Sequence, residues 1–130
     1  MPSASIAKEL VASLPAKTGL IADVTAAIRA AGVNVRAISA YESDGVGHFL
    51  LVTDDNVKAA VALELMGAKP YEKQIVLADI DNRPGALEEV ARMLADADIN
   101  LEYVYGASGS AGKARFVFST TNDEKACSLL

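Results

Sequence analysis

The sequence predicts an α+β fold made of two copies of one βαββα unit, each with its helices on one face of an antiparallel sheet. Two observations predict it. When the sequence is aligned with itself at one constant offset and without a gap, apolar positions coincide. This alignment matches Leu10 with Val76 and Gly19 with Gly85. Each copy also alternates Val-, Leu- and Ile-rich runs with apolar residues at helical spacing. Two unrelated halves that share a period by accident are the alternative.

The two copies predict the same elements in the same order. In the first copy we expect strands at residues 6–14, 35–41 and 46–53 and helices at 20–31 and 55–66. In the second copy we expect strands at 74–80, 101–107 and 112–119 and helices at 85–97 and from 121 to the end of the chain. Turns at Ser43-Asp44-Gly45 and Ser108-Gly109-Ser110 separate the paired strands.

The repeat predicts domains at residues 1–68 and 69–130. A short fourth strand near residues 69–73 extends the first copy, whereas the second copy ends without one. The corresponding sheet edge is therefore open, or it is filled by another chain or by the other copy.

Composition excludes several classes of function. The chain has 130 residues, 52% of them apolar, and a net charge of -5, which argues against nucleic acid and membrane surfaces as partners. The lone Cys127 and the lone His48 give no Cys–His nucleophile and no metal-ligand spacing, so we expect neither a catalytic centre nor a metal or other cofactor. Without a signal-peptide pattern or a long apolar run, the expected location is the cytoplasm.

The strand at residues 46–53 is apolar on both faces. His48, Leu50 and Val52 share one face, and Phe49 and Leu51 lie on the other. An apolar second sheet face indicates association, so we expect both cover by the other copy and a homodimer, with a plain monomer as the alternative.

A polar turn interrupts the second copy between its first strand and its first helix, at residues 79–87. Pro84 and Gly85 form the turn, and the helix N-terminus after Gly85 offers unpaired N–H groups to an anion. Asn82 and Asn100 each donate and accept hydrogen bonds, and Asp81 can receive an ammonium group. The predicted ligand site is therefore Asp81, Asn82, Gly85, Ala86, Leu87 and Asn100.

This motif, residues 81–87 followed by 98–101, together with the βαββα pattern, resembles the ACT domain, a small regulatory module. The resemblance covers essentially the whole chain as two tandem, ferredoxin-like domains with no catalytic domain attached. It implies a non-catalytic regulatory or sensor protein that binds a free amino acid at domain interfaces, beneath the loop between the first strand and first helix. It also implies an enzyme or another regulatory protein as a partner.

The first copy departs from the motif. Gly19 and Asn34 are kept and, with Leu20, give a second, reduced site, but Ala16 stands where the second copy has Asn82. Two other functions remain open: a ligand-free oligomerising subunit, and a small enzyme of the acylphosphatase type, for which Arg83 beside Asn82 would serve. The repeat argues against the enzyme.

Overall fold

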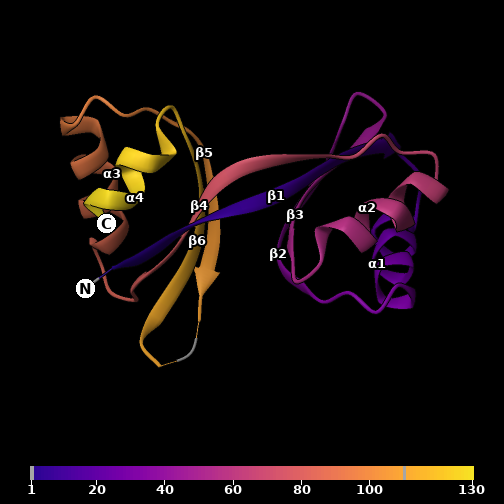
Figure 1. The fold of residues 1–130 in the computed structure, drawn as a ribbon, viewed down its shortest axis with the longest axis horizontal. Coiled ribbons are helices and arrows are strands. Elements are labelled where there is room, and N and C mark those ends of the chain that lie inside the picture. The colour runs from indigo at the N-terminus through magenta and orange to yellow at the C-terminus, as the bar shows by residue number, and fades with distance from the viewer. Residues whose placement is uncertain (1, 110) are drawn as a thin grey trace. The chain divides into compact units, whose positions relative to one another are not determined.

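The computed structural model describes residues 2–109 and 111–130, which form six strands and four helices (Figure 1). The first half contains β1 (Ser3–Pro15), α1 (Leu20–Ala30), β2 (Val35–Ser43), β3 (Val46–Thr53) and α2 (Asn56–Leu65). The second half contains β4 (Tyr71–Asp81), α3 (Ala86–Asp96), β5 (Leu101–Ser108), β6 (Lys113–Thr120) and α4 (Asp123–Leu129). The α+β class and the antiparallel, ferredoxin-like arrangement are confirmed. Ser110, in the predicted second turn, lies outside the described residues.

The chain divides into two compact units whose bounds differ from the prediction. One unit is Lys8–Lys73, here called the insert unit. The other, the split unit, joins Met1–Ala7 to Gln74–Leu130. Relative to domains at 1–68 and 69–130, two short segments have changed places: the start of β1 belongs with the second copy, and the start of β4 belongs with the first.

The physical reason is the length of β1 and β4. At about 3.3 Å per residue, the 13 residues of β1 extend roughly 43 Å, more than one small unit needs. β1 and β4 are hydrogen-bonded neighbours. Ser3–Ala7 therefore occupies the position of a fourth strand beside β4 in the split unit, where Ala4 packs against the core. Of the three alternatives for this edge, the structure shows it filled by a segment from the other half of the chain.

Strand register shows that the repeat is not gapless. Leu14 pairs with Gly47 in the insert unit, and Ile80 pairs with Ala114 in the split unit. The shift that carries Leu14 onto Ile80 would carry Gly47 onto Lys113, one position before the residue that pairs with Ile80. The β5–β6 hairpin thus carries one extra residue, and the gapless alignment is wrong beyond it.

The helix caps agree with this extra residue. Asp55 caps α2 and Asn122 caps α4, each accepting a hydrogen bond from a backbone N–H in the first turn of its helix. The gapless shift would instead carry Asp55 onto Thr121. Beyond the hairpins, Gly47 of the insert unit therefore corresponds to Ala114 of the split unit, and Asp55 corresponds to Asn122.

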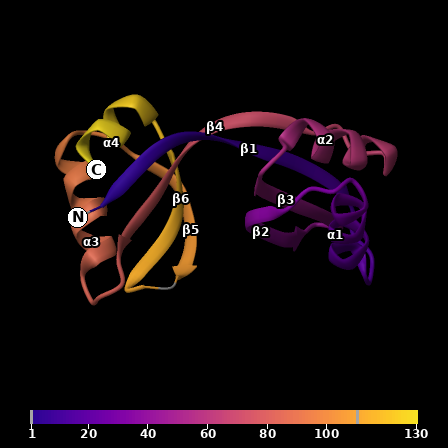
Figure 2. The same cartoon turned by 60° about the horizontal axis from the view of Figure 1, so that its bottom comes forward.

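Each unit packs its helices on one face of its strands, as both views show (Figures 1 and 2). Alternate strand residues point towards these helices, as expected for a half-covered sheet. The insert-unit core includes Leu10, Val24, Ile28, Phe49 and Leu63, and the split-unit core includes Val76, Val90, Leu94, Phe118 and Ala126. No helix in the described part of the chain is both long and apolar enough to cross a bilayer.

Candidate functional site

A left-handed glycine begins the first helix of each unit. Gly19 precedes α1 with φ +83°, and Gly85 precedes α3 with φ +86°. Space around either Cα would admit a Cβ, so the backbone conformation is what requires glycine here. No side chain of the described residues caps either helix. The Leu20 and Ala86 N–H groups donate to the carbonyls of Lys17 and Arg83. The N–H groups that follow them in the first turns of α1 and α3 are the ones available to an anion, which the helix dipole favours.

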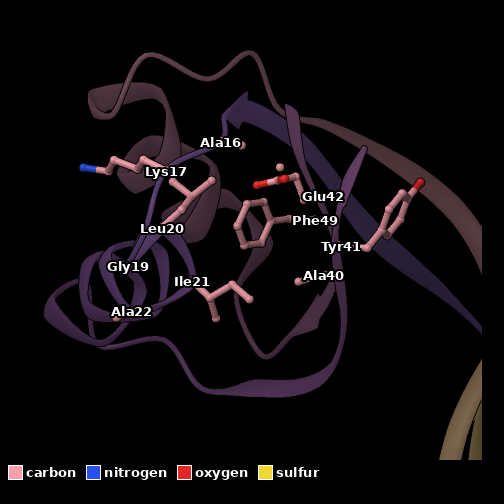
Figure 3. Close-up of a pocket in the computed structure, with 11 residues that line it drawn as sticks. Ala16, Lys17, Gly19, Leu20, Ile21, Ala22, Ala40, Tyr41, Glu42 and Phe49 are labelled. Atoms are coloured by element: carbon pink, nitrogen blue, oxygen red, sulfur yellow. The ribbon is translucent and has the colours of Figure 1, made fainter. Parts of the chain in front are cut away.

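A cavity of about 210 Å³ opens at the start of α1, within the insert unit (Figure 3). The β1–α1 loop, the first turn of α1 and the β2–β3 hairpin surround it. The lining residues are Ala16, Lys17, Gly19, Leu20, Ile21, Ala22, Ala40, Tyr41, Glu42, Gly47 and Phe49. The volume suits a small molecule of amino-acid size rather than a nucleotide or a large cofactor.

The walls of this cavity are mainly apolar. Figure 3 shows the ring of Phe49 between Leu20 and Ala40, whereas the side chains of Lys17 and Tyr41 point away. The Lys17 ammonium lies 2.9 Å from the Asp23 carboxylate, which holds it against α1. Tyr41 stacks on His48 at 5.0 Å between ring centroids, and both lie on the sheet face opposite Phe49.

Glu42 is the charged side chain that faces the cavity interior (Figure 3). It follows Ala40 on the side of β2 that faces the helices, opposite Gly47 in register. None of the hydrogen bonds or ion pairs among the described residues uses its carboxylate. A cavity with helix N–H groups at one end and a carboxylate beside them is complementary to a molecule that carries both an anion and a cation.

Close contact between strand and helix shapes this cavity. A Cβ added at Gly47 would lie 2.5 Å from Leu20 Cδ2, so Gly47 leaves room for Leu20. The split unit has the reverse pairing of sizes, with Ala114 at the position of Gly47 and Ala86 at the position of Leu20. Both alanines are buried.

The corresponding loop of the split unit already has partners for its polar groups. The Ser108 hydroxyl donates to Asn82 Oδ1 at 3.3 Å, and the Asn82 N–H donates to the Gly112 carbonyl at 2.8 Å. Ser108 and Asn82 stand where the insert unit has Glu42 and Ala16. Small Ala16 leaves the space that the Asn82–Ser108 contact occupies in the split unit.

Asp81 and Arg83, beside this loop, are paired with protein charges. Lys113 Nζ lies 2.8 Å from Asp81 Oδ1, and Arg83 lies 2.7 Å from a Glu89 carboxylate oxygen. The hydrogen bond from Lys113 and its charge lower the pKa of Asp81. A ligand ammonium would have to compete with Lys113 for Asp81. Of the other predicted residues, Ala86 is buried and Leu87 is 37% exposed.

Asn100 and Asn34 lie at the far ends of their helices. Asn100 follows α3, and Asn34 follows α1; each helix has 11 residues and is therefore about 16 Å long. Their backbones bond locally: the Asn34 N–H donates to Asp54, and the Asn100 N–H donates to Thr121. The expectation that Asn82 and Asn100 converge on one spot is thus not met within the split unit, and Asn34 is likewise remote from Gly19.

Sequence reasoning therefore identified Gly19 and Leu20 in the cavity but missed its other walls. Ala40, Glu42, Gly47 and Phe49 come from the β2–β3 hairpin, which follows only after the whole of α1. One signal was present in the sequence, because Glu42 is a charge on the strand face that otherwise points towards the core. No cluster of three or more His, Cys, Asp or Glu side chains suited to a metal occurs among the described residues.

Comparisons with known proteins agree with the fold. Over 98% of this chain, a solved structure from Bacteroides thetaiotaomicron is 27% identical with a TM-score of 0.89, and the match covers 88% of that protein. The ligand-free regulatory subunit of aspartate kinase from Thermus thermophilus is 17% identical, with a TM-score of 0.72 and coverage of 98% and 93%. The Thermus flavus regulatory subunit is also 17% identical, with a TM-score of 0.68 and the same coverage.

No curated protein matches this chain. Residues 8–68 match the ACT domain family, and this range falls within the insert unit, which contains the cavity. The insert unit, over residues 8–68, is thus similar to an ACT domain.

Proposed function

We propose that the protein is a non-catalytic regulatory protein that binds a free amino acid, and that the insert-unit cavity is its principal site. The ACT match over residues 8–68 supports a regulatory, ligand-binding role, and the fold shared with aspartate kinase regulatory subunits agrees with it. The observation that carries the proposal is the pairing of uncapped α1 N–H groups with the Glu42 carboxylate across one cavity.

In this arrangement the ligand carboxylate takes the N–H groups at the start of α1, and its ammonium faces Glu42. Its side chain then lies against Leu20, Ala40 and Phe49. The cavity volume and its apolar walls favour a small aliphatic amino acid. The split unit, which repeats the same order of elements, is proposed as a second ACT domain whose loop at Asn82 and Gly85 forms a weaker site, with Asn100 contributing from another domain.

Ligand binding would regulate by stabilising one conformation over another, in the protein itself or in an enzyme that it contacts. We also propose a homodimer as the assembled state.

Isothermal titration with each of the twenty amino acids tests the site. The wild-type protein should bind one of them saturably, and Glu42→Gln should weaken binding about 10- to 100-fold, since a hydrogen bond to a charged group contributes about 1.5–3 kcal/mol. Asn82→Ala is the matched control in the other unit and should have a smaller effect. If Asn82→Ala abolishes binding and Glu42→Gln does not, the principal site is in the split unit. Failure of every amino acid to bind would count against the function itself.

A further inference from the structure

One face of α2 is apolar and exposed, although it lies opposite the face that packs in the core. Val57, Val61 and Leu65 are 71%, 53% and 85% exposed and recur at every fourth position, which places them in a stripe along the helix. Ala59 and Leu63, on the opposite side, are fully buried. An exposed apolar stripe opposite the core face of a helix is typical of an association surface.

A groove of about 530 Å³ runs beside this stripe, between α1 and α2 of the insert unit. The two helices lie side by side in both views (Figures 1 and 2). Alanines supply much of the groove, and larger apolar side chains and one lysine complete it. The lining residues are Ala27, Ala30, Ala31, Val57, Lys58, Val61, Ala62, Leu65 and Met66. We call the stripe and the groove together the α1/α2 face.

The split unit shows that the fold does not require this apolar face. With the helix caps Asp55 and Asn122 aligned, Val57 corresponds to Glu124 and Val61 to Ser128. Glu124 accepts a hydrogen bond from Gln74 at 3.0 Å, and the Ser128 hydroxyl donates to its own helix. The positions of Val57 and Val61 are therefore polar in the split unit and apolar in the insert unit, which indicates a role other than folding.

We propose that the α1/α2 face binds the same face of a second copy of this chain, about a two-fold axis near Val61. A two-fold interface requires a surface that is complementary to itself. The α1/α2 face meets this requirement because the α2 stripe is a ridge that forms one wall of a groove, and alanines form much of the rest of that groove. The ridge of each copy can enter the groove of the other.

The charges around the face fit a second copy as well. Lys58 and Glu64 stand at equal distances before and after Val61 in the sequence, with opposite signs. A two-fold axis at Val61 can set Lys58 of each copy against Glu64 of the other. The insert unit has seven Lys and Arg against eight Asp and Glu, a net charge of 7 − 8 = −1, whereas the rest of the chain has 5 − 9 = −4. Association through the insert unit thus meets the least repulsion.

Sedimentation equilibrium over a concentration series tests the proposal, under reducing conditions because Cys127 is free. The wild-type protein should show a concentration-dependent dimer. Val61→Glu should raise the dimer Kd more than about tenfold, since two carboxylates would face each other at the axis. Ser128→Glu, at the equivalent position of α4, is the matched control and should dimerise like wild type.

Charge reversal provides a second measurement that does not depend on how Val61→Glu folds. Lys58→Glu and Glu64→Lys should each weaken the dimer, and the two together should restore it, since both partners then carry the exchanged pair. Only a second copy of the same chain gives this restoration. A wild-type protein that stays monomeric at all concentrations, or a Val61→Glu dimer as tight as wild type, would overturn the proposal.

Discussion

Replacing Gly47 by alanine should close the cavity at the start of α1, proposed above as the ligand site, while leaving the fold nearly as stable as before. The new Cβ would lie 2.5 Å from Leu20 Cδ2, which is too close, whereas the Leu14 carbonyl oxygen and the Phe49 ring, both at 3.6 Å, are at ordinary contact distance. Leu20 is the side chain that must move. It lines the cavity, so it can rotate into that space.

The change in the free energy of unfolding depends on where the Leu20 side chain moves. Overpacking in a filled core costs about 1–3 kcal/mol. Here a shifted rotamer costs about 0.5–1.5 kcal/mol. Because Gly47 does not adopt a positive φ, alanine also reduces the freedom of the unfolded chain and returns about 0.4–1 kcal/mol. The net change in the free energy of unfolding should therefore stay within about 1 kcal/mol of zero.

Affinity should respond far more strongly than stability. A methyl group of Leu20 displaced into a cavity of about 210 Å³ removes room that the ligand needs. We expect a loss of more than about tenfold, or about 1.4 kcal/mol, in titrations with the bound amino acid. Guanidinium unfolding measured on the same samples gives the stability change.

A double-mutant cycle with Leu20→Ala identifies the cause. Leu20→Ala alone should cost about 2–5 kcal/mol as a buried truncation. Adding Gly47→Ala should lower the free energy of unfolding less in the Leu20→Ala background than in wild type, because the Leu20 side chain that clashes with the new Cβ is gone. The double variant then has alanine at the two positions that Ala114 and Ala86 occupy in the split unit. If Gly47→Ala costs more than about 3 kcal/mol, the upper end for overpacking, and Leu20→Ala gives no coupling, Leu20 is not the limiting neighbour and the reasoning fails.

Two further predictions concern the split unit. Arg115 donates two hydrogen bonds to Asp79, at 2.9 and 3.2 Å, and lowers the pKa of that carboxyl from its ordinary 3.8. The ion pair therefore stabilises the fold fully at any pH above the pKa of Asp79 in the unfolded chain, and this stabilisation is lost as the pH falls through the lower pKa of the folded protein. Arg115→Ala should thus be less stable than wild type at pH 7 and approach wild-type stability well below pH 3.8. Urea unfolding between pH 2 and 7 checks it, with Arg92→Ala, in an exposed pair, as a control that should show no such pH dependence. Deleting residues 3–7 should expose the β4 edge and lower protection from hydrogen exchange there, while residues of β3 keep theirs; equal loss in β3 would contradict the assignment of this segment.

Local pattern was enough to predict the elements. Apolar alternation located the strands, and the helix predicted from residue 55 begins at Asn56, with the Asp55 side chain accepting from the Lys58 N–H as its cap. The helix starts followed from Gly19 and Gly85, whose positive φ values explain why both copies keep glycine.

The register of the strands and the contacts between distant residues could not be predicted from the sequence pattern. An extra residue in the β5–β6 hairpin leaves the apolar pattern almost unchanged, since both faces of β3 and of β6 carry apolar side chains. The gapless repeat was therefore convincing and wrong beyond the hairpin. The walls of the cavity depend on Glu42 and Phe49 meeting Leu20, which is a matter of tertiary packing that periodicity does not contain.

The exchanged starts of β1 and β4 have a consequence for how such a chain can arise. Residues 3–7 and 69–73 lie at the starts of β1 and β4, and each belongs to the unit that is built mainly from the other half of the chain. A single ancestral copy would thus lack a strand of its own, yet two identical copies would supply each other's missing strand as a swapped pair. Gene duplication and fusion near Gly67 would turn that pair into one polypeptide without a new contact. The fused halves could then diverge, one keeping a cavity beside Glu42 and the other filling the same place with Asn82 and Ser108.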